Sequence, residues 1–506
     1  MVSENSLEQK RFSTRDIWIV VCSALVITLA PSFQSFWIDE ATMALISRST
    51  VFYKQILLGH MTASETMMPF ATTYFWVLEK IVGDSEWALR LGNLPWLWFG
   101  VFCMALIGKR TGWAWLPLLF AIHPVVWFYA DEVRPYSIQL GAGCWLALGF
   151  VQLLQSEGRQ SRGFWNFGFA AAVIISASFL GIFVVAAAGL VLLIQGFSRR
   201  WKLRAGQYGI LGGVAILNLI LVALMVLKIH AGAEGGRAWM VGVSNLGFAA
   251  YELLGFVGLG PGRESIRASA TTGGSAAAAQ LLIPSLFKLG LLVIIYGGVV
   301  YAAFRASRNS AAKPTLRLAL LSCSVSVLSI GCLLGASLAS SFPFWGRHLA
   351  PTLPFLLLSV AGAAAAIRSI WTNRQEAFLF VPLFLVLFYS SCVIRWSSTH
   401  AKDDYRAATT IAREYLAEGK RISWIAAPGP AMYYEIPLSN DWPPAPGTVS
   451  IILPTPGSNS RPDVILVSKP DVFDHQRFLP EWTSLPGIEN SVPCQSFVLY
   501  QLPPSP

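Results

Sequence analysis

The stretch DIWIVVCSALVITLAPSFQSFWIDEA, residues 16–41, decides how the chain is interpreted. Residues 16–34 are apolar and long enough to cross a hydrocarbon core, which takes about 20 residues in a helix. Two adjacent carboxylates, Asp39 and Glu40, follow shortly after this run. No small-residue cleavage site follows the run, so we interpret it as a retained first span and not as a signal peptide. We therefore expect a membrane protein whose first outer loop carries an acid pair.

The composition of the whole chain supports the membrane class. Of its 506 residues, 54% are hydrophobic and 13% are charged, whereas soluble domains carry about 25% charged residues. The formal net charge is +10, as in some proteins that bind nucleic acid, but multi-pass membrane proteins concentrate Lys and Arg in their cytoplasmic loops. The seven cysteines show no disulfide or zinc spacing. The composition predicts an α-helical polytopic protein of the cell (inner) membrane, with no nucleic-acid partner.

Hydropathy divides the chain into about eleven predicted transmembrane helices. Residues 164–197 form one long apolar stretch, which we interpret as two short spans hinged near Ser178 to Gly181. Residues 69–83 are apolar but short, and they fit a helix that lies at the membrane interface. The predicted spans are 16–34, 87–108, 113–130, 137–155, the pair within 164–197, 206–228, 285–304, 318–340, 349–367 and 376–394.

The basic residues predict the orientation of these spans. With a cytoplasmic N-terminus, every loop on the inner side is basic, as the positive-inside rule requires. If residues 164–197 were a single span, the later basic loops would fall outside, so we reject that count. The inner loops are 1–15, 109–112, 156–163, 198–205, 305–317 and 368–375.

Residues 395–506 differ from the rest and predict a small extracytoplasmic α/β domain. Residues 403–418 have the pattern of an amphipathic helix, and four short apolar runs separated by turn residues follow it. The transmembrane bundle is then residues 1–394. Its catalytic outer loops are 35–86, 131–136, 229–284 and 341–348, and the short apolar runs of the tail are 422–427, 449–453, 464–467 and 497–502.

The acid pair in the first outer loop has two interpretations. A carboxylate of Asp39 or Glu40 at the mouth of the bundle could act as a general base that takes a proton from an acceptor hydroxyl. Alternatively, both acids are solvated and stabilise the N-terminus of a helix that starts at Ala41, since acids favour that end of a helix. The chemistry of the two residues leaves both interpretations open.

A denser polar cluster, residues 131–136, stands where the third predicted span leaves the membrane. Arg134 could pair with a phosphate through two parallel hydrogen bonds, Glu132 could orient an acceptor or a metal ion, and Tyr136 could line a sugar site. An interfacial anchor belt would explain Arg134 and Tyr136, but not Asp131 and Glu132. The cluster therefore favours a functional site.

A third cluster, Arg347 and His348, lies at the outer end of the tenth predicted span. Few arginines are expected outside, so Arg347 needs a partner, and a phosphate and a salt bridge to one of the acids are equally good candidates. The glycines of residues 260–263 form too short a pattern to predict a phosphate loop, and His123 fits a helix-packing contact. A base, a second acid and a cation at one surface fit group transfer from a lipid-linked phosphate donor.

Five segments of the chain resemble the GT-C superfamily of membrane glycosyltransferases. The branch they resemble contains bacterial relatives of the protein O-mannosyltransferases and of the aminoarabinose transferase, families 39 and 83. Residues 129–136 resemble the second-loop motif and are the most specific piece. The others are residues 39–41, which resemble the first-loop acidic motif, 83–90, the approach to the second span, 347–354, the late Arg-Tyr-x-x-Pro-x-x-Pro segment, and 404–408, the start of the outer domain.

The resemblance implies inverting transfer from a polyprenyl-phosphate sugar donor to a glycan, lipid or protein acceptor. It implies Asp39 as the base with Glu40 beside it, Glu132 and Arg134 in the active site, and Arg347 as a candidate for the donor phosphate. His348 stands where relatives commonly have Tyr. No cofactor is fixed by the motifs; a divalent metal is compatible with them, but they define no metal site. The roles of His60 and Glu65, before the interfacial helix, stay open.

Two other classes of protein remain as alternatives. A transporter or flippase for a lipid-linked or anionic solute would need ionisable groups within its spans, whereas these spans are almost free of charge. A non-catalytic assembly subunit would use its outer domain as an interaction module, and its acid clusters could then be replaced without loss.

Overall fold

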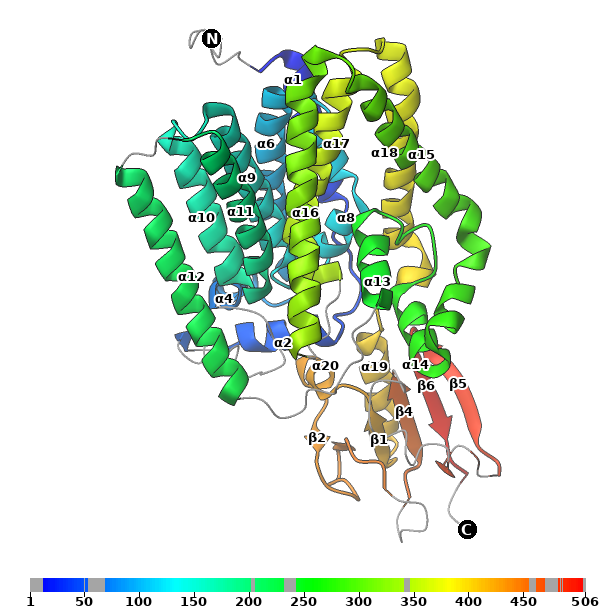
Figure 1. The fold of residues 1–506 in the computed structure, drawn as a ribbon. Coiled ribbons are helices and arrows are strands. Elements are labelled where there is room, and N and C mark those ends of the chain that lie inside the picture. The colour runs from blue at the N-terminus through cyan, green and yellow to red at the C-terminus, as the bar shows by residue number, and fades with distance from the viewer. Residues whose placement is uncertain are drawn as a thin grey trace.

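The computed structural model describes residues 12–49, 51–52, 69–201, 205–231, 243–340, 346–454, 461–468, 481–482, 484 and 486–503. A helical bundle occupies most of the chain, and a small domain with a sheet lies at one end of it (Figure 1). The start of α1 (Thr14–Thr28) lies at the opposite end of the bundle from that domain. The expected loops are only partly described: residues 53–68 with His60 and Glu65, 202–204, 232–242 and 341–345 lie outside the described residues.

Within the described residues, seven helices are long and apolar enough to cross a membrane. The other four predicted spans are also helical, as α1, α7 with α8, α10 and α12. The fold class expected from the sequence, a polytopic helical protein with a small α/β domain, is confirmed. The seven spans are Glu86–Thr111 (α5 and α6), Tyr136–Ser156 (α9), Phe179–Ser198 (with α11), Ile283–Ala306 (with α15), Ser310–Ala339 (within α16), Gly346–Ile367 (with α17) and Asn373–Trp396 (α18).

The hinge expected within residues 164–197 is present. Helix α10 (Ser161–Ala177) ends at Ser178, which is extended, and a short 3₁₀ turn leads into α11 (Ile182–Ser198). At the hinge the carbonyl oxygens of Ile174 and Ser178 also accept hydrogen bonds from the Gln139 amide, at 3.5 and 3.4 Å. Two helices therefore replace one long span.

The third predicted span is broken, which the sequence analysis did not anticipate. It consists of α7 (Leu116–Ala121) and α8 (Pro124–Ala130). His123 Nδ1 accepts a hydrogen bond from the Val125 backbone N–H at 3.3 Å and so caps α8, while Pro124 occupies the first helical position, where its missing N–H costs nothing. His123 is thus a helix cap, and α8 delivers the next loop to the end of the bundle.

Helix α9 forms the centre of the bundle and is buried along most of its length. It packs against α6 (Leu94–Thr111), α10 and the 3₁₀ turn Gly346–Thr352. Glycines permit this close packing: a Cβ at Gly141 would lie 2.3 Å from the Trp96 carbonyl oxygen. Because α9 begins at Tyr136, this rigid central helix positions the polar loop 131–135 before it.

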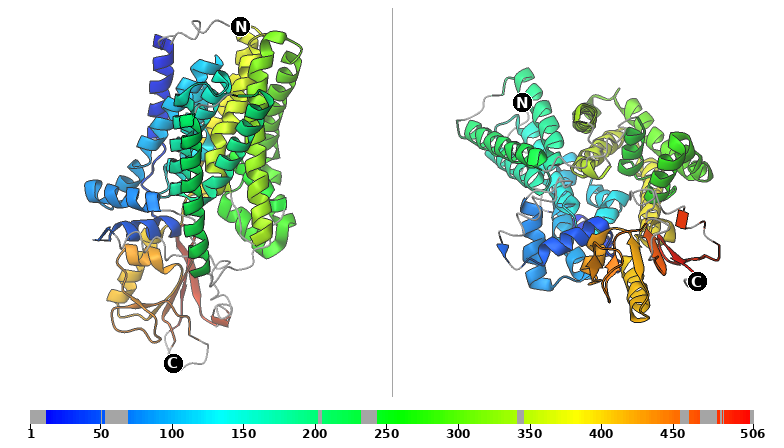
Figure 2. Two further views of the ribbon diagram at one scale, coloured as in Figure 1. Left: turned by 60° about the vertical axis from the view of Figure 1, so that its left-hand side comes forward. Right: turned by 90° about the horizontal axis from the view of Figure 1, so that it is seen from below.

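Two short helices lie across the end of the bundle that carries the sheet domain (Figure 2). They are α2 (Ile38–Ser47) and α4 (Pro69–Val82). Helix α4 buries Phe75 while Val77 and Ile81 are exposed, which is the amphipathic arrangement expected for an interfacial helix. The acid pair of the first loop lies in the first turn of α2.

The C-terminal domain has one sheet with strand order β2-β3-β1-β4-β6-β5. Strands β2, β3, β1 and β4 are parallel, while β6 is antiparallel to both β4 and β5. Tyr405 of α19 packs against Trp424 and Phe497 in the core of this domain. Its elements are α19 (Tyr405–Ala417), β1 (Ile422–Ile425), α20 (Pro428–Tyr433), β2 (Leu438–Ser439), β3 (Val449–Ser450), β4 (Val464–Ser468), β5 (Glu489–Cys494) and β6 (Phe497–Gln501).

The C-terminal domain is attached to the bundle beside the acid pair. Helix α20 packs against α2. Tyr434 Oη accepts a hydrogen bond from the Phe36 backbone N–H at 2.9 Å and lies 2.8 Å from Glu86 Oε1, and Tyr433 Oη donates to the Asp84 carbonyl at 2.7 Å. The domain therefore holds both the segment that precedes α2 and the segment that precedes α5.

Candidate active site

Asp39, in the first turn of α2, is the accessible member of the acid pair. Its side chain is 19% exposed and lies between two guanidinium groups. Arg347 Nη1 donates to Asp39 Oδ2 at 3.0 Å, and Arg134 Nη2 lies 3.7 Å from the same oxygen. The helix N-terminus and the two cations together favour a charged carboxylate at this position.

Glu40, the next residue, is fully buried. Arg90 binds both of its oxygens, from Nε at 3.0 Å and from Nη2 at 2.9 Å. Lys402 Nζ donates to Glu40 Oε2 at 2.8 Å, and the Val133 backbone N–H donates to Oε1 at 3.1 Å. Glu40 therefore joins α2 to α5, to the loop before α9 and to the segment after α18.

Asp131 is the second buried acid of this region. Its carboxylate accepts from Arg395 Nη1 at 2.7 Å and from the Ser32 backbone N–H at 2.5 Å, and Lys402 Nζ lies 3.3 Å away. Burial alone would raise the pKa of Asp131, but Arg90, Lys402 and Arg395 hold it well below its usual range. Asp131 thus stays ionised inside the protein. We call Glu40, Arg90, Asp131, Arg395 and Lys402 the buried charge cluster.

Glu132 differs from its neighbour Asp131. It is 2% exposed, and its Oε2 has no hydrogen-bond partner among the described residues. Burial raises the pKa of Glu132 to about 7, and the charge on Glu40 adds to this effect, while Lys402 and other nearby cations oppose it. A carboxyl group whose pKa is moved to neutrality in a polar site is a candidate for proton transfer or substrate binding.

A further ion pair, Glu252 with Arg263, completes the site. Glu252 lies in the last turn of α13 (Val243–Leu253), and Arg263 begins α14 (Arg263–Gln280). The Arg263 guanidinium lies 3.4 Å from the centre of the Phe128 ring, and its Nη2 is 3.5 Å from Tyr129 Oη. Burial raises the pKa of Glu252. The glycine pattern of residues 260–263, too short to predict a phosphate loop, therefore ends in Arg263, an arginine of the candidate active site.

Gly346 brings the last loop close to this ion pair. A Cβ at Gly346 would lie 1.7 Å from Glu252 Oε2, so no other residue fits here without displacing the carboxylate. Arg347 follows directly and reaches Asp39. His348 is buried near Arg134 and Arg347. The tight contact at Gly346 thus fixes the direction in which Arg347 enters the site.

Tyr136, the first residue of α9, is buried, and its ring lies 4.8 Å from that of Tyr129. It therefore lies on the same side of the bundle end as Arg263, which contacts Tyr129. All eight residues chosen from the sequence lie at this end of the bundle. Glu40 and Asp131 are buried among several charged partners, and Arg134 and Arg347 flank Asp39. The other three, Glu132, Tyr136 and His348, are also buried.

The sequence analysis missed Arg90, Arg395, Lys402 and the Glu252–Arg263 pair. A signal for the cations was available, because arginines and lysines on the predicted outer side are few and each needs a partner. By this criterion the sequence analysis identified only Arg347. Among the described residues, no group of three or more His, Cys, Asp or Glu side chains is arranged to hold a metal ion.

No protein-family model matches the sequence, and a comparison with curated proteins gives no match. Two solved structures align with this chain over nearly its whole length, and both are ArnT from Cupriavidus metallidurans. The structure bound to undecaprenyl phosphate aligns with a TM-score of 0.50 and 13% identity, covering 96% of this chain and 97% of that chain. The apo structure aligns with a TM-score of 0.50, 12% identity and the same coverage of 96% and 97%.

The archaeal oligosaccharyltransferase AglB from Archaeoglobus fulgidus, in complex with an inhibitory peptide and a dolichol-phosphate, aligns less well. Its TM-score is 0.38 at 11% identity, over 80% of this chain and 58% of that chain. The assignment of the fold is therefore based on the two ArnT structures alone. This chain has the fold of those membrane proteins, and the GT-C fold expected from its sequence is confirmed.

Proposed function

We propose that this protein is a membrane glycosyltransferase that moves a sugar from a polyprenyl-phosphate donor to an acceptor hydroxyl at the outer face of the membrane. The observation that carries the proposal is the position of Asp39. It is a partly exposed carboxylate held beside two arginines at one end of a membrane bundle. The fold shared with ArnT, one structure of which is bound to undecaprenyl phosphate, supports a lipid-phosphate donor.

Asp39 acts as the general base in this proposal. The acceptor oxygen attacks the anomeric carbon of the donor sugar while its proton passes to Asp39. The bond between the anomeric carbon and the phosphate oxygen breaks, and its electron pair leaves with the lipid phosphate. Attack from the side opposite the leaving group inverts the anomeric configuration.

Arg347 stabilises the negative charge that develops on the departing phosphate, and Arg134 assists it. In the free protein Arg347 donates to Asp39 at 3.0 Å. A donor phosphate offers the same guanidinium two acceptor oxygens in a suitable geometry. Donor binding would then turn Arg347 away from Asp39 and release the carboxylate for the acceptor, so the donor binds before the base becomes free.

Glu40 receives a different role from the one that the resemblance implied. Arg90, Lys402 and the Val133 N–H occupy both of its oxygens. Glu40 is therefore a positioning residue that fixes α2, whereas Glu132, with an unpartnered oxygen, is the second acid available to orient the acceptor.

The first test is sugar transfer by the purified protein in nanodiscs. A panel of radiolabelled polyprenyl-phosphate sugars is offered with membrane extract as acceptor. Label should enter an acceptor with the parent protein and not with Asp39→Asn. Asp441→Asn, an exposed acid of the C-terminal domain, is the matched control and should retain full transfer. Transfer by Asp39→Asn at the parent rate would remove Asp39 as the base. No transfer or donor hydrolysis by the folded parent protein would favour a transporter or assembly subunit.

A further inference from the structure

Two neighbouring pockets lie along α19. The first has a volume of about 590 Å³ and the second about 320 Å³, and both are lined by Ile411. Successive turns of α19 supply the wall, because residues three or four apart share one helix face. We call this surface the α19 groove, and its helix residues are Arg406, Ala407, Thr410, Ile411, Glu414, Tyr415 and Glu418.

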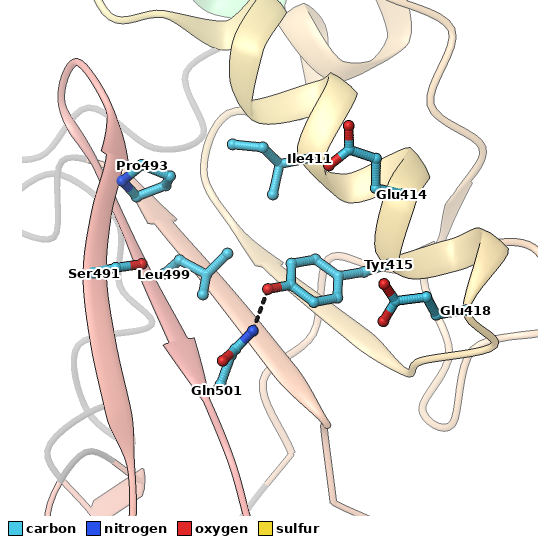
Figure 3. A pocket seen from close by; sticks show the side chains of 8 residues that line it. All are labelled: Ile411, Glu414, Tyr415, Glu418, Ser491, Pro493, Leu499 and Gln501. Atoms are coloured by element: carbon cyan, nitrogen blue, oxygen red, sulfur yellow. Dashed lines mark hydrogen bonds between the residues drawn. The ribbon is translucent and has the colours of Figure 1, made fainter.

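The other wall of the α19 groove is the hairpin of β5 and β6. Leu499 and Gln501 on β6 are two residues apart and so point to one face of the sheet, and Ser491 and Pro493 of β5 line the same pocket. Figure 3 shows these side chains facing those of α19 across the pocket, with Tyr415 Oη hydrogen-bonded to Gln501 Nε2. The groove thus lies between α19 and the β5–β6 hairpin.

One end of the groove lies beside the candidate active site. It is lined there by Gln34 and Ser35, in the segment that leads into α2, and by Lys402. The Lys402 backbone N–H donates to Gln34 Oε1 at 3.2 Å, and its ammonium group donates to Glu40 at 2.8 Å. The groove therefore runs from the neighbourhood of Glu40 to the far end of α19.

The lining of the groove excludes some ligands. An anion would need an uncommitted cation, but Lys402 is paired with Glu40, and Arg406 donates to the Phe33 carbonyl at 2.6 Å and lies 3.2 Å from Glu86. The rest of the polar lining both donates and accepts hydrogen bonds, or only accepts them, and several of its groups keep further capacity beside one bond within the protein, as Gln34 does with the Lys402 N–H and Thr410 with the Arg406 carbonyl. It consists of the amides and hydroxyls of Gln34, Ser35, Thr410, Ser491, Gln495 and Gln501 and the carboxylates of Glu414 and Glu418.

We propose that the α19 groove binds the acceptor, and that the acceptor is a linear, uncharged oligosaccharide or polysaccharide. Sugar hydroxyls both donate and accept hydrogen bonds, so they are suitable partners for the amides, hydroxyls and carboxylates of the lining. The cations of the lining are already paired and are less suitable partners. Both pocket volumes lie in the range of about 300–1,000 Å³ that is usual for ligand sites. The proposal rests on the proposed function and gives it an acceptor class. A chain lying in the groove would end beside Gln34 and Lys402, whose ammonium group binds Glu40, the residue next to Asp39.

The test measures oligosaccharide binding separately from transfer. The full-length protein in nanodiscs is titrated with linear hexasaccharides of glucose, of mannose and of N-acetylglucosamine, and binding is followed by saturation-transfer NMR. We expect at least one hexasaccharide to bind, and Asp39→Asn to bind it as well as the parent. Thr410→Trp and Ser491→Trp fill the groove from its two walls and should each weaken binding by about tenfold or more.

Ala417→Trp is the matched control, since Ala417 is exposed on α19 but does not line either pocket. Binding by both groove variants equal to that of Ala417→Trp would overturn the proposal. So would failure of all three hexasaccharides to bind, or binding of an extended peptide that the groove variants block, since β5 is an edge strand of the sheet. Oligosaccharide binding without transfer from any donor would instead remove the proposed function and leave the groove as a glycan-binding site.

Discussion

Arg347 Nη1 lies 3.0 Å from Asp39 Oδ2, although the two residues are 308 positions apart in sequence. Glu252 and Gly346 on one side, and the N-terminus of α2 on the other, hold the two side chains in this arrangement. Asp39 thus accepts a hydrogen bond from the residue that the proposed mechanism assigns to the donor phosphate.

The first prediction concerns Arg347. Replacing it with Ala should lower kcat/KM for the lipid-phosphate donor by about 10²–10³-fold, the usual effect of losing one preorganised donor to a developing charge. Arg347→Lys keeps the charge without the fork geometry of the guanidinium, so its kcat/KM should lie between those of the parent and of Arg347→Ala. Arg374→Ala, an exposed arginine after α17, is the control. Parent-like kinetics in Arg347→Ala would assign the phosphate to another cation, of which Arg134, 3.7 Å from Asp39, is the first candidate.

The second prediction concerns the buried charge cluster. Arg90→Ala should destabilise the folded protein by about 3–5 kcal/mol, because it leaves Glu40 and Asp131 without a principal counter-ion. Arg199→Ala breaks the half-exposed pair with Glu157 and should change stability by less than about 1 kcal/mol. Unfolding in detergent, followed by intrinsic fluorescence, measures both. Equal stabilities of the two variants would contradict a structural role for the cluster.

The third prediction uses the ionisation of Glu132. Burial raises its pKa from 4.5 to about 7, so the folded state holds more protons than the unfolded state between these pH values. This group therefore lowers the free energy of unfolding as pH rises from about 4.5 to 7, by up to about 3 kcal/mol. Glu132→Gln should be more stable than the parent at about pH 8 and equally stable at about pH 4.5. Identical stability profiles across this range would show that Glu132 ionises normally.

The fourth prediction concerns Gly346. An added methyl group would lie 1.7 Å from Glu252 Oε2, so Gly346→Ala must displace the carboxylate or the backbone before Arg347. We expect a loss of about 1–3 kcal/mol in stability and a lower transfer rate. Gly189→Ala, in α11, meets no atom within 4 Å and should be neutral or stabilising. An active, stable Gly346→Ala protein would show that the last loop can shift freely.

Hydropathy predicted the positions of the helices because a membrane requires a minimum apolar length, whatever the packing. It also located the hinge near Ser178, since residues 164–197 are too long for one span. The break at His123 was missed because Pro at the first position of a helix leaves the surrounding stretch as apolar as an unbroken span. Local sequence therefore defined where helices lie, but not where backbone hydrogen bonds are interrupted.

The candidate site was predictable as a set of loops, but not as a geometry. Neighbouring helical residues point about 100° apart, so Asp39 and Glu40 had to face different surroundings. Which of them is buried is decided by Arg90 and Lys402, the latter 362 residues from Glu40. Contacts over such separations depend on tertiary packing and have no signal in the local pattern.

The long-range contact of Lys402 with Glu40 also determines when, during synthesis of the chain, the candidate site can form. Arg90 follows Glu40 closely and is available early in synthesis, but Arg395 and Lys402 come only at the end of α18 and just after it. A nascent chain would thus contain Asp39 long before all the contacts that fix α2 through Glu40 can form. The candidate site would therefore be complete only after α18 and the segment that follows it have been synthesised.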